Sequence, residues 1–489
     1  MGDNSHSGTP DRRSGGNLLP EGWCQSTIGE LAEVNPKKID ADLGLKAGFV
    51  PMALAPVNFL DSLEHEEKTW GEIKKSYTNF QDNDVIFAKV TPCFENGKAA
   101  IVRNLPNAIG AGSSEFYVLR VHKSLISEKL IFAVVKTFDF LQQGVENMTG
   151  AVGLRRVPRA FVEAFPVPLP PLAEQKIIAE KLDTLLAQVD TIKARLERIP
   201  DIIKRFRQSV LATAVSGKLT EEWREANSGH YSPKLNEKYD IDDKYTYDIP
   251  INWILTAIGN CSSFQQGLQI AKNTRTNEPG DGVLPILRTV NYENGFQHDV
   301  HYASFDSKTI IAEPEDVVIS RTGTVGRVLT GYKGIIHNNS FRLNYQKSLL
   351  NREYLIFFLQ SPICQLYVQE NSGRSTQPDL THKAFSRCPL SLPPKNEQTE
   401  IVRRVEELFA FADTIEQKAA AALERVNNLT QSILAKAFRG ELTADWRAAN
   451  PELISGDNSA EALLAKIQAE REALALEKKA AKKTRKKKA

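Results

Sequence analysis

Leu169-Pro-Pro-Leu-Ala-Glu-Gln175 is the stretch that decides the fold, because it recurs as Leu392-Pro-Pro-Lys-Asn-Glu-Gln398. A second stretch, residues 217–224, begins Gly-Lys-Leu-Thr and ends Trp-Arg, and it recurs at residues 440–447, which begin Gly-Glu-Leu-Thr and end Trp-Arg. In both cases the second copy lies 223 positions after the first. Self-similarity at a fixed spacing predicts that the 489-residue chain consists of two copies of one unit.

The upstream part of the repeat has a slightly different spacing. Leu19-Pro20 with Trp23 matches Ile249-Pro250 with Trp253, 230 positions later. The part of the unit between this start and the Pro-Pro stretch is therefore seven residues longer in the first copy than in the second. The two copies share a plan and differ in detail.

Each Pro-Pro pair precedes a heptad pattern. Apolar residues recur at alternating spacings of 4 and 3, which is the a/d seam of a coiled coil. The predicted seam residues are Ile178, Leu182, Leu185, Val189, Ile192 and Leu196 in the first copy and Ile401, Val405, Leu408, Ile415, Val426 and Leu429 in the second. We expect helices of about 40 residues, or about 60 Å each, ending at the glycine caps Gly217 and Gly440. Pro200 predicts a kink or break in the first helix.

An apolar seam on each helix needs a partner. Two copies in one chain meet at high effective concentration, which favours pairing within the chain. A coiled coil between two identical chains is the alternative.

The segments before the helices are rich in β-forming residues, for example at residues 84–88, 115–119 and 316–320, and in glycine- and asparagine-rich turns. The predicted fold class is therefore α/β (α+β), with two compact modules alternating with long coiled-coil helices. The predicted domains are a disordered tail (1–18), a first module (19–165), a helical spacer (166–225), a linker (226–248), a second module (249–388), a second helical spacer (389–447), and an amphipathic segment with a basic tail (448–489).

Composition narrows the class of protein. No stretch approaches the roughly 18 apolar residues that span a bilayer, and residues 1–16 have no apolar signal-peptide core. The five cysteines include no Cys-x-x-Cys pair, which suits a reducing compartment. We therefore expect a soluble, cytoplasmic protein.

Net charge is +2, but residues 478–488 hold eight cations and no acid, which leaves −6 for the rest. Any contact of the body of the protein with nucleic acid must then come from local patches. The basic tail is either a flexible, non-specific DNA arm or the solvated end of the amphipathic segment 460–477.

Motifs for catalysis are not found. The sequence has no Gly-x-x-x-x-Gly-Lys-Ser/Thr loop and no Gly-x-Gly-x-x-Gly turn, and Asn35-Pro36-Lys37 only partly matches the Asn-Pro-Pro-Phe/Tyr motif of adenine methyltransferases. His298 and His301 lack further ligands around them, so we predict no metal site. No catalytic residue is predicted.

Polar loops at corresponding places in the two modules suggest DNA contact instead. Arginine suits guanine or phosphate, asparagine and glutamine suit adenine, and hydroxyl groups suit phosphate. The predicted DNA-binding residues are Lys89, Thr91, Ser113, Ser114, Arg155 and Arg156 in the first module and Arg321, Thr322, Asn338, Asn339, Arg374, Ser375 and Gln377 in the second.

The run from Pro168 to Asp190 resembles the central conserved region of type I restriction-modification specificity subunits, and residues 400–444 resemble their distal conserved region. Both runs are most similar to the type IA, EcoK-like branch. The close match covers about residues 160–225 and 389–475, and the repeat extends it over the whole chain.

This resemblance implies that each module is a target recognition domain for one half of a split DNA site. It also implies that the helices pair antiparallel within the chain, with pseudo-twofold symmetry, and hold the domains a fixed distance apart. The implied partners are double-stranded DNA, two methyltransferase subunits and two restriction/translocase subunits. S-adenosylmethionine, ATP and Mg²⁺ would belong to those subunits, and this chain would bind no cofactor and no membrane.

The repeat leads independently to a similar expectation. Two similar modules on a rigid spacer predict two half-sites separated by unread bases, about one helical turn from centre to centre. Because the modules are not identical, the site should be asymmetric. Two alternatives stay open: a coiled-coil scaffold without DNA specificity, and a DNA-modifying enzyme whose motif is not recognised.

Overall fold

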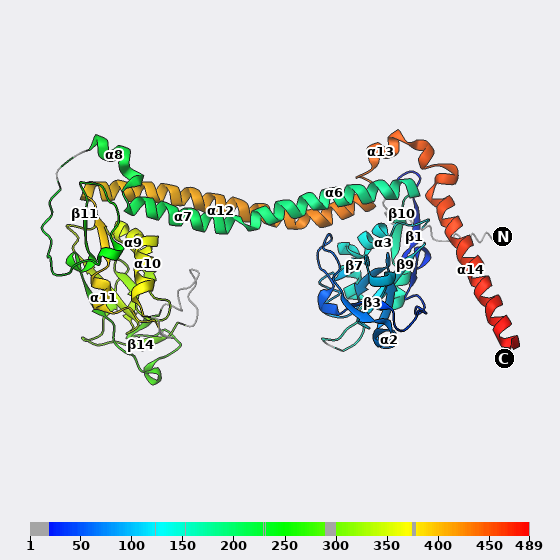
Figure 1. Cartoon of the computed structure of the whole chain (residues 1–489), viewed down its shortest axis with the longest axis horizontal. Coiled ribbons are helices and arrows are strands. Elements are labelled where there is room, and N and C mark those ends of the chain that lie inside the picture. Colours follow the sequence, from blue (N-terminus) through cyan, green and yellow to red (C-terminus); the bar gives the residue numbers. More distant parts are fainter. Residues whose placement is uncertain are drawn as a thin grey trace, which may run out of the picture. The chain divides into compact units, whose positions relative to one another are not determined.

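The computed structural model describes residues 19–122, 124–151, 153–227, 229, 231–288, 300–373 and 378–488 (Figure 1). The chain divides into two compact units. Unit 1 comprises residues 1–196 and 422–489, and unit 2 comprises residues 197–421. Each unit contains one of the predicted modules, called domain 1 (19–165) and domain 2 (249–388) below.

Domain 1 has two four-stranded sheets. Their strand orders are β2-β9-β6-β7 and β4-β3-β8-β5, and β3 and β8 form a parallel pair. The strands of the first sheet are β2 (Ala32–Val34), β9 (Phe116–Val121), β6 (Val85–Ala88) and β7 (Ala99–Ile101). Those of the second are β4 (Glu66–Thr69), β3 (Lys46–Val50), β8 (Ile109–Gly112) and β5 (Thr78–Gln81).

Domain 2 repeats this topology. Its sheets have the orders β12-β19-β16-β17 and β14-β13-β18-β15, and β13 and β18 are again parallel. The strands of the first sheet are β12 (Ser262–Gln266), β19 (Ser340–Tyr345), β16 (Val317–Ser320) and β17 (Val328–Leu329). Those of the second are β14 (Tyr302–Ser304), β13 (Val283–Leu287), β18 (Gly334–Ile336) and β15 (Ile311–Ala312). The two domains therefore have the same fold.

A two-stranded antiparallel pair joins the start of each domain to its end: β1 (Cys24–Thr27) with β10 (Pro166–Leu169), and β11 (Ile254–Ala257) with β20 (Pro389–Leu392). The strand that enters each domain thus lies beside the strand that leads into the long helix.

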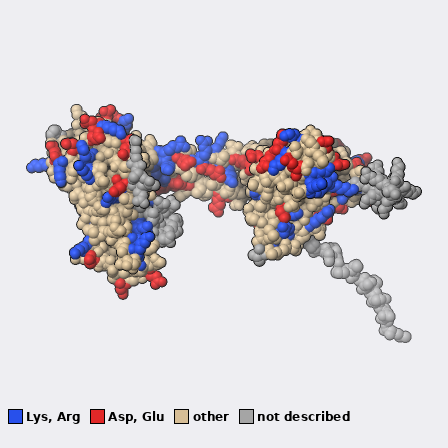
Figure 2. All heavy atoms as spheres, turned by 60° about the horizontal axis from the view of Figure 1, so that its bottom comes forward, with Lys and Arg blue, Asp and Glu red and all other residues tan. Residues whose placement is uncertain are grey.

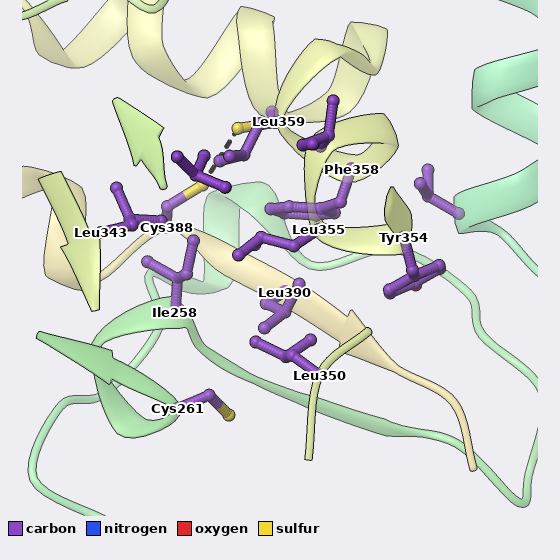
Figure 3. Close-up of a cluster of buried hydrophobic side chains, with 14 of the residues drawn as sticks. Ile258, Cys261, Leu343, Leu350, Tyr354, Leu355, Phe358, Leu359, Cys388 and Leu390 are labelled. Carbon is purple, nitrogen blue, oxygen red and sulfur yellow. Dashed lines mark hydrogen bonds between the residues drawn. The ribbon is translucent and has the colours of Figure 1, made fainter. Parts of the chain in front are cut away.

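Helices pack on both sheets of domain 1 and on the first sheet of domain 2. Domain 1 has α1 (Ile28–Leu31), α2 (Trp70–Ile73), α3 (Glu128–Val135), α4 (Phe138–Glu146) and α5 (Arg159–Ala164). Domain 2 has α9 (Arg352–Gln360), α10 (Pro362–Asn371) and α11 (His382–Ser386). Figure 3 shows the resulting core of domain 2, in which side chains from α9, including Leu355 and Phe358, meet Leu390 of β20 and Leu343 of β19. The five cysteines are free thiols, and Cys364 and Cys388 lie within this core.

The long helices are confirmed, and so is the break at Pro200. The first is split into α6 (Leu172–Glu197) and α7 (Ile199–Val215), with Pro200 in the first turn of α7. The second is one helix, α12 (Lys395–Phe438). Gly217 and Gly440 follow the helix ends with left-handed φ angles of 80° and 72°, as a C-terminal glycine cap requires.

An antiparallel helix pair forms within each unit. In unit 1, Ile178 and Leu182 of α6 share a buried cluster with Leu434 near the end of α12. In unit 2, Val210 of α7 shares a core with Ile401 and Val405 near the start of α12. Figure 1 shows α12 beside each partner helix.

The predicted seam is wrong at three positions of unit 1. Leu186 is buried in place of Leu185, and Ile192 and Leu429 are 44% and 39% exposed. Trp23 and Ala133 of domain 1 join the cluster that buries α6. Because α6 packs against the domain as well as against α12, its buried residues follow the 3.6-residue helical period more closely than a strict heptad. The other seam residues are buried or half-buried.

A buried glutamate explains the repeated residues that flank the helices. Glu174 is fully buried and accepts hydrogen bonds from Trp23 Nε1 (2.7 Å), Thr443 Oγ1 (2.6 Å) and Arg447 Nη1 (2.5 Å). We call these four residues the Glu174 cluster. Since a buried carboxylate must be paired and hydrogen-bonded, the cluster joins the entry of domain 1, the start of α6 and the segment after α12.

The same cluster occurs in unit 2. Glu397 accepts from Trp253 Nε1 (2.8 Å), Thr220 Oγ1 (2.8 Å) and Arg224 Nε (2.9 Å), forming the Glu397 cluster. In each unit the glutamate of one copy therefore binds the Thr and Arg of the other copy. This exchange links the two halves of the sequence within both units.

The neighbouring glutamine fixes the domain to its helix. Gln175 Oε1 accepts from the amide of Ser127 (3.0 Å), just before α3, and Gln398 Oε1 accepts from the amide of Asn351 (2.7 Å), just before α9. The Glu-Gln pairs that decided the fold from sequence thus hold together the parts of each unit.

The segments after the helices lie against the domains. In unit 2, α8 (Glu221–Ala226) leads into the predicted linker, where Tyr231, Leu235 and Tyr245 pack against the domain 2 core. In unit 1, α13 (Ala444–Ala449) leads to α14 (Ala460–Lys488), and Ala460, Leu463 and Ile467 of α14 are buried in the domain 1 core. The amphipathic part of the C-terminal segment is thus an integral part of unit 1.

Candidate DNA interface

Three loops meet beside the first sheet of domain 1. The amide of Lys89, just after β6, donates to Glu115 O (2.9 Å), just before β9. The amide of Val157 donates to Lys89 O (2.9 Å), and that of Arg156 donates to Thr149 O (2.8 Å). Main-chain bonds therefore fix the positions of Lys89, Glu115 and Arg156, which we call site 1.

Domain 2 repeats these bonds in register. The amide of Arg321 donates to Asn339 O (2.7 Å), that of Leu380 to Arg321 O (3.0 Å), and that of Asp379 to Ser372 O (2.6 Å). The strand registers Ala88↔Phe116 and Ser320↔Ser340 establish the same correspondence. Arg321, Asn339 and Asp379, called site 2, therefore match Lys89, Glu115 and Arg156 one by one.

Site 1 contains a bidentate ion pair. Arg156 donates from Nε and Nη2 to the two carboxylate oxygens of Glu115, at 2.9 and 2.8 Å. This contact, together with the charge of Lys89, lowers the pKa of Glu115, and the Glu115 carboxylate raises the pKa of Arg156. Lys89 Nζ donates to Ser114 O (2.8 Å) and lies 5.5 Å from the centre of the Tyr117 ring.

Site 2 contains the same kind of pair between different positions. Arg321 donates from Nε and Nη2 to the carboxylate of Asp379, at 2.5 and 2.8 Å, and this contact raises the pKa of Arg321. Asn339 Oδ1 lies 3.2 Å from Nδ1 of His337. Burial and the charge of Arg275 lower the pKa of His337, so that its ring is neutral near pH 7.

The other predicted residues of domain 1 lie in or next to the same loops. Thr91 points its hydroxyl toward Met148 Sδ (3.6 Å) and Arg155 O (3.4 Å) rather than toward solvent. Ser113 Oγ accepts from the amide of Glu115 (3.2 Å), and Ser114 is exposed. Arg155 is paired with Glu95 at 3.5 Å.

In domain 2, Thr322 pairs with Asp379 in an isolated β-bridge, and the carbonyl of Asn338 accepts from Gln266 Nε2 (3.0 Å). Asn338 and Thr322 are both half-buried. Arg374, Ser375 and Gln377 lie outside the described residues. The structure thus brings Arg321, Thr322, Asn338 and Asn339 together.

Sequence reasoning missed the acids of both sites. Glu115 and Asp379 are the partners of the two arginines, but a search for DNA contacts favours cations and amides over carboxylates. The available signal was their position, because Glu115 follows the predicted Ser113-Ser114 pair and Asp379 follows the predicted loop 374–377.

The distribution of charge on the surface agrees with the expectation that nucleic acid would be contacted through local basic patches. On the face drawn in Figure 2, Lys and Arg side chains lie in separate groups among Asp and Glu. Within the described part of the chain, no group of three or more His, Cys, Asp or Glu side chains is placed to hold a metal ion. Among the same residues, no helix is both long and apolar enough to cross a membrane.

Comparison with known proteins bears directly on these two domains. The family model of the type I restriction modification DNA specificity domain matches residues 20–201 and 250–425, one copy in each half of the chain. The chain belongs to this family. Each match covers one recognition domain together with most of the long helix that follows it, as the internal repeat predicts.

Relatives of this family match almost the whole chain. The EcoKI specificity subunit of Escherichia coli is 36% identical, over 93% of this chain and 97% of its own length. The EcoDI specificity subunit of Escherichia coli is 40% identical, over 93% of this chain and 96% of its own length. The HsdS subunit from Thermoanaerobacter tengcongensis has a similar fold, with a TM-score of 0.61 at 20% identity over 87% of this chain and 99% of that subunit.

Proposed function

We propose that this chain is the DNA sequence-recognition subunit of a type I restriction-modification complex. The proposal rests on one observation. The same arrangement of main-chain hydrogen bonds occurs in both domains, but it carries different polar side chains in each. Site 1 presents Lys89 with the Arg156–Glu115 pair, and site 2 presents Asn339 with the Arg321–Asp379 pair. Base-specific recognition requires such differences in donors and acceptors on a fixed support.

The proposed target is split and asymmetric. Each domain recognises one half-site, and the helix pairs that hold the domains set the number of unread bases between them. A chain with two different domains has no reason to prefer a palindrome, because a palindromic site reflects a protein with two identical halves. The family membership of both halves supports this assignment.

The chemistry is proposed to belong to partner subunits in the cytoplasm. Two methyltransferase subunits would supply S-adenosylmethionine-dependent methylation of adenine, and two restriction/translocase subunits would use ATP and Mg²⁺. This chain would bind none of these cofactors and would have no catalytic residue. The relatives are named as specificity subunits of restriction enzymes, which supports a role as one part of an assembly.

Selection from a randomised DNA library tests the proposal. The chain is purified with its cognate methyltransferase subunit, and the bound DNA is sequenced. We expect two short blocks of specified bases with different sequences, separated by a fixed number of unspecified bases. A complex that binds without enrichment would support a scaffold without DNA specificity, and an enriched palindrome would contradict the asymmetric assignment.

A methyl-transfer assay tests the non-catalytic assignment separately. The purified chain alone is incubated with DNA and labelled S-adenosylmethionine. We expect no transfer without the methyltransferase subunit. Transfer by the chain alone would show that it is an enzyme.

A further inference from the structure

Both sites hold an arginine in the same way, although the arginine comes from different positions. In site 1 it is Arg156, on the third loop, and in site 2 it is Arg321, on the first loop. In site 2 the position of Arg156 is occupied by Asp379, and in site 1 the position of Arg321 is occupied by Lys89. The main-chain arrangement is thus the same in the two sites, and each site has a bidentate arginine–carboxylate pair. The pair occupies different positions of that arrangement in site 1 and in site 2.

The pairs use the same edge of the guanidinium group. Each arginine donates from Nε and Nη2, so its carboxylate lies along the side of the group. A guanidinium group has five N–H bonds in a fixed plane, so three remain, two on Nη1 and one on Nη2. Within the described part of the chain, Nη1 of neither arginine donates a hydrogen bond.

Both arginine side chains are also partly exposed. The side chains of Arg156 and Arg321 are 42% and 24% exposed even with their carboxylates in place. The planar end of a guanidinium group matches two acceptors at once, as presented by O6 and N7 of guanine in the major groove. The bound carboxylate fixes the plane of the arginine before DNA arrives, which lowers the entropic cost of the contact.

We propose that Arg156 and Arg321 each recognise a guanine, one in each half-site, and that Glu115 and Asp379 are the positioning residues that orient them. This inference rests on the proposed function. It places the contact on a base rather than on phosphate, because each guanidinium charge is already balanced by a carboxylate 2.5–2.9 Å away. A phosphate at the free edge would be repelled by that carboxylate, whereas guanine is uncharged.

The test uses the complex with the methyltransferase subunit and the library selection described above. Arg156→Lys and Arg321→Lys keep the positive charge and remove the planar fork. We expect Arg156→Lys to lower the preference for guanine about 10- to 100-fold at one position of one half-site, since a bidentate contact contributes about that much discrimination. Arg321→Lys should do the same at one position of the other half-site only.

Two further variants test the positioning role. Glu115→Gln and Asp379→Asn keep the shape of the acceptor but remove its charge. We expect each to weaken the guanine preference at the position affected by its own arginine, with every other position unchanged. A purely structural role would instead lower the stability of the domain and leave the base preferences of the folded fraction intact.

Matched controls come from arginine–carboxylate pairs elsewhere in the same domains. Arg103 pairs with Glu128 in domain 1, and Arg342 pairs with Asp316 in domain 2. Arg103→Lys and Arg342→Lys should leave the selected sequences unchanged. Thermal unfolding of every variant complex verifies that the domains remain folded.

Three results would overturn the inference. Equal weakening on all sequences, with a smaller dependence on salt, would show a phosphate contact. A lost preference for a base other than guanine would show a different base contact, and unchanged preferences would show that the arginines have no part in recognition. Failure of the proposed function is distinguishable, because the wild-type complex would then select no sequence at all.

Discussion

At the scale of single residues, the strongest constraint is the buried carboxylate of Glu174 and its counterpart Glu397. The sequence identified both as repeated residues, but it could not show their role, because Thr443 and Arg447 lie 269 and 273 positions from Glu174. The same limit applies to site 1 and site 2. There the sequence suggested Arg156 and Arg321, and only the fold shows which acids hold them.

Removal of either carboxylate should destabilise one unit. Glu174→Ala leaves a buried arginine, threonine and indole without their acceptor, which should cost about 3–5 kcal/mol. We expect faster hydrogen exchange in residues 440–450 and little change in residues 217–227, with the reverse for Glu397→Ala. Glu180→Ala, at an exposed position of α6, is the control. Equal exchange in all three variants would contradict the role given to the Glu174 cluster.

Lys136 should make the stability of unit 1 depend on pH. Lys136 is 6% exposed as a residue, and its ammonium group donates to Val57 O (2.5 Å) and Gly97 O (2.7 Å). Burial lowers the pKa of Lys136 from 10.5 to about 8. Between pH 8 and 10.5 the unfolded chain therefore binds the proton that the folded chain has lost, so stability rises with pH in this window.

The expected gain is at most about 3–4 kcal/mol, because each pKa unit corresponds to about 1.4 kcal/mol. Below pH 8 the cost of burying the charge is fully present. Lys136→Met should abolish this rise in denaturant unfolding of unit 1 measured at pH 8 and 10. A variant with the same pH dependence as the wild type would show that another group is responsible.

At the scale of elements, the heptad pattern predicted both long helices, and Pro200 and the two glycines marked a break and two ends that the structure confirms. Strands β6, β9 and β16 were also recognisable as β-rich runs. The seam failed at Leu185, Ile192 and Leu429 because a helix that also packs against a domain does not keep a strict coiled-coil face. Periodicity shows that a partner exists, but it does not show how many partners a helix has.

The docking of α14 is a further element-level prediction. Leu463 is 5% exposed in the domain 1 core, whereas Leu476 of the same helix is 66% exposed. Leu463→Ala should destabilise unit 1 by about 2–5 kcal/mol, and Leu476→Ala should have almost no effect. Hydrogen exchange should rise in domain 1 and not in domain 2. Unchanged exchange in domain 1 would contradict a stabilising role for α14.

At the scale of the whole molecule, the repeat was fully visible in the sequence, and the matching strand orders of the two domains confirm it. The sequence could not show which polar loops meet, because loop positions depend on strand register across 20 to 28 residues, as between Ala88 and Phe116 or Ser320 and Ser340. Four of the six residues of site 1 and site 2 were therefore predictable from residue type, but the pairing of the two arginines with Glu115 and Asp379 was not.

The spacing of the half-sites should depend on the helices alone. Inserting equal numbers of residues into α6 and α12 should change the number of unread bases and leave the bases of both half-sites unchanged. The library selection measures both quantities at once. Altered bases within a half-site would contradict a spacer function for the helices.

The most direct test of the central claim is to map N6-methyladenine across the genome of a host that expresses this chain with its cognate methyltransferase subunit. The account predicts one split motif, with two different half-sites at a fixed separation, that is absent when either subunit is omitted. No new methylation from a complex verified to be soluble and assembled, or methylation without a defined motif, would contradict it.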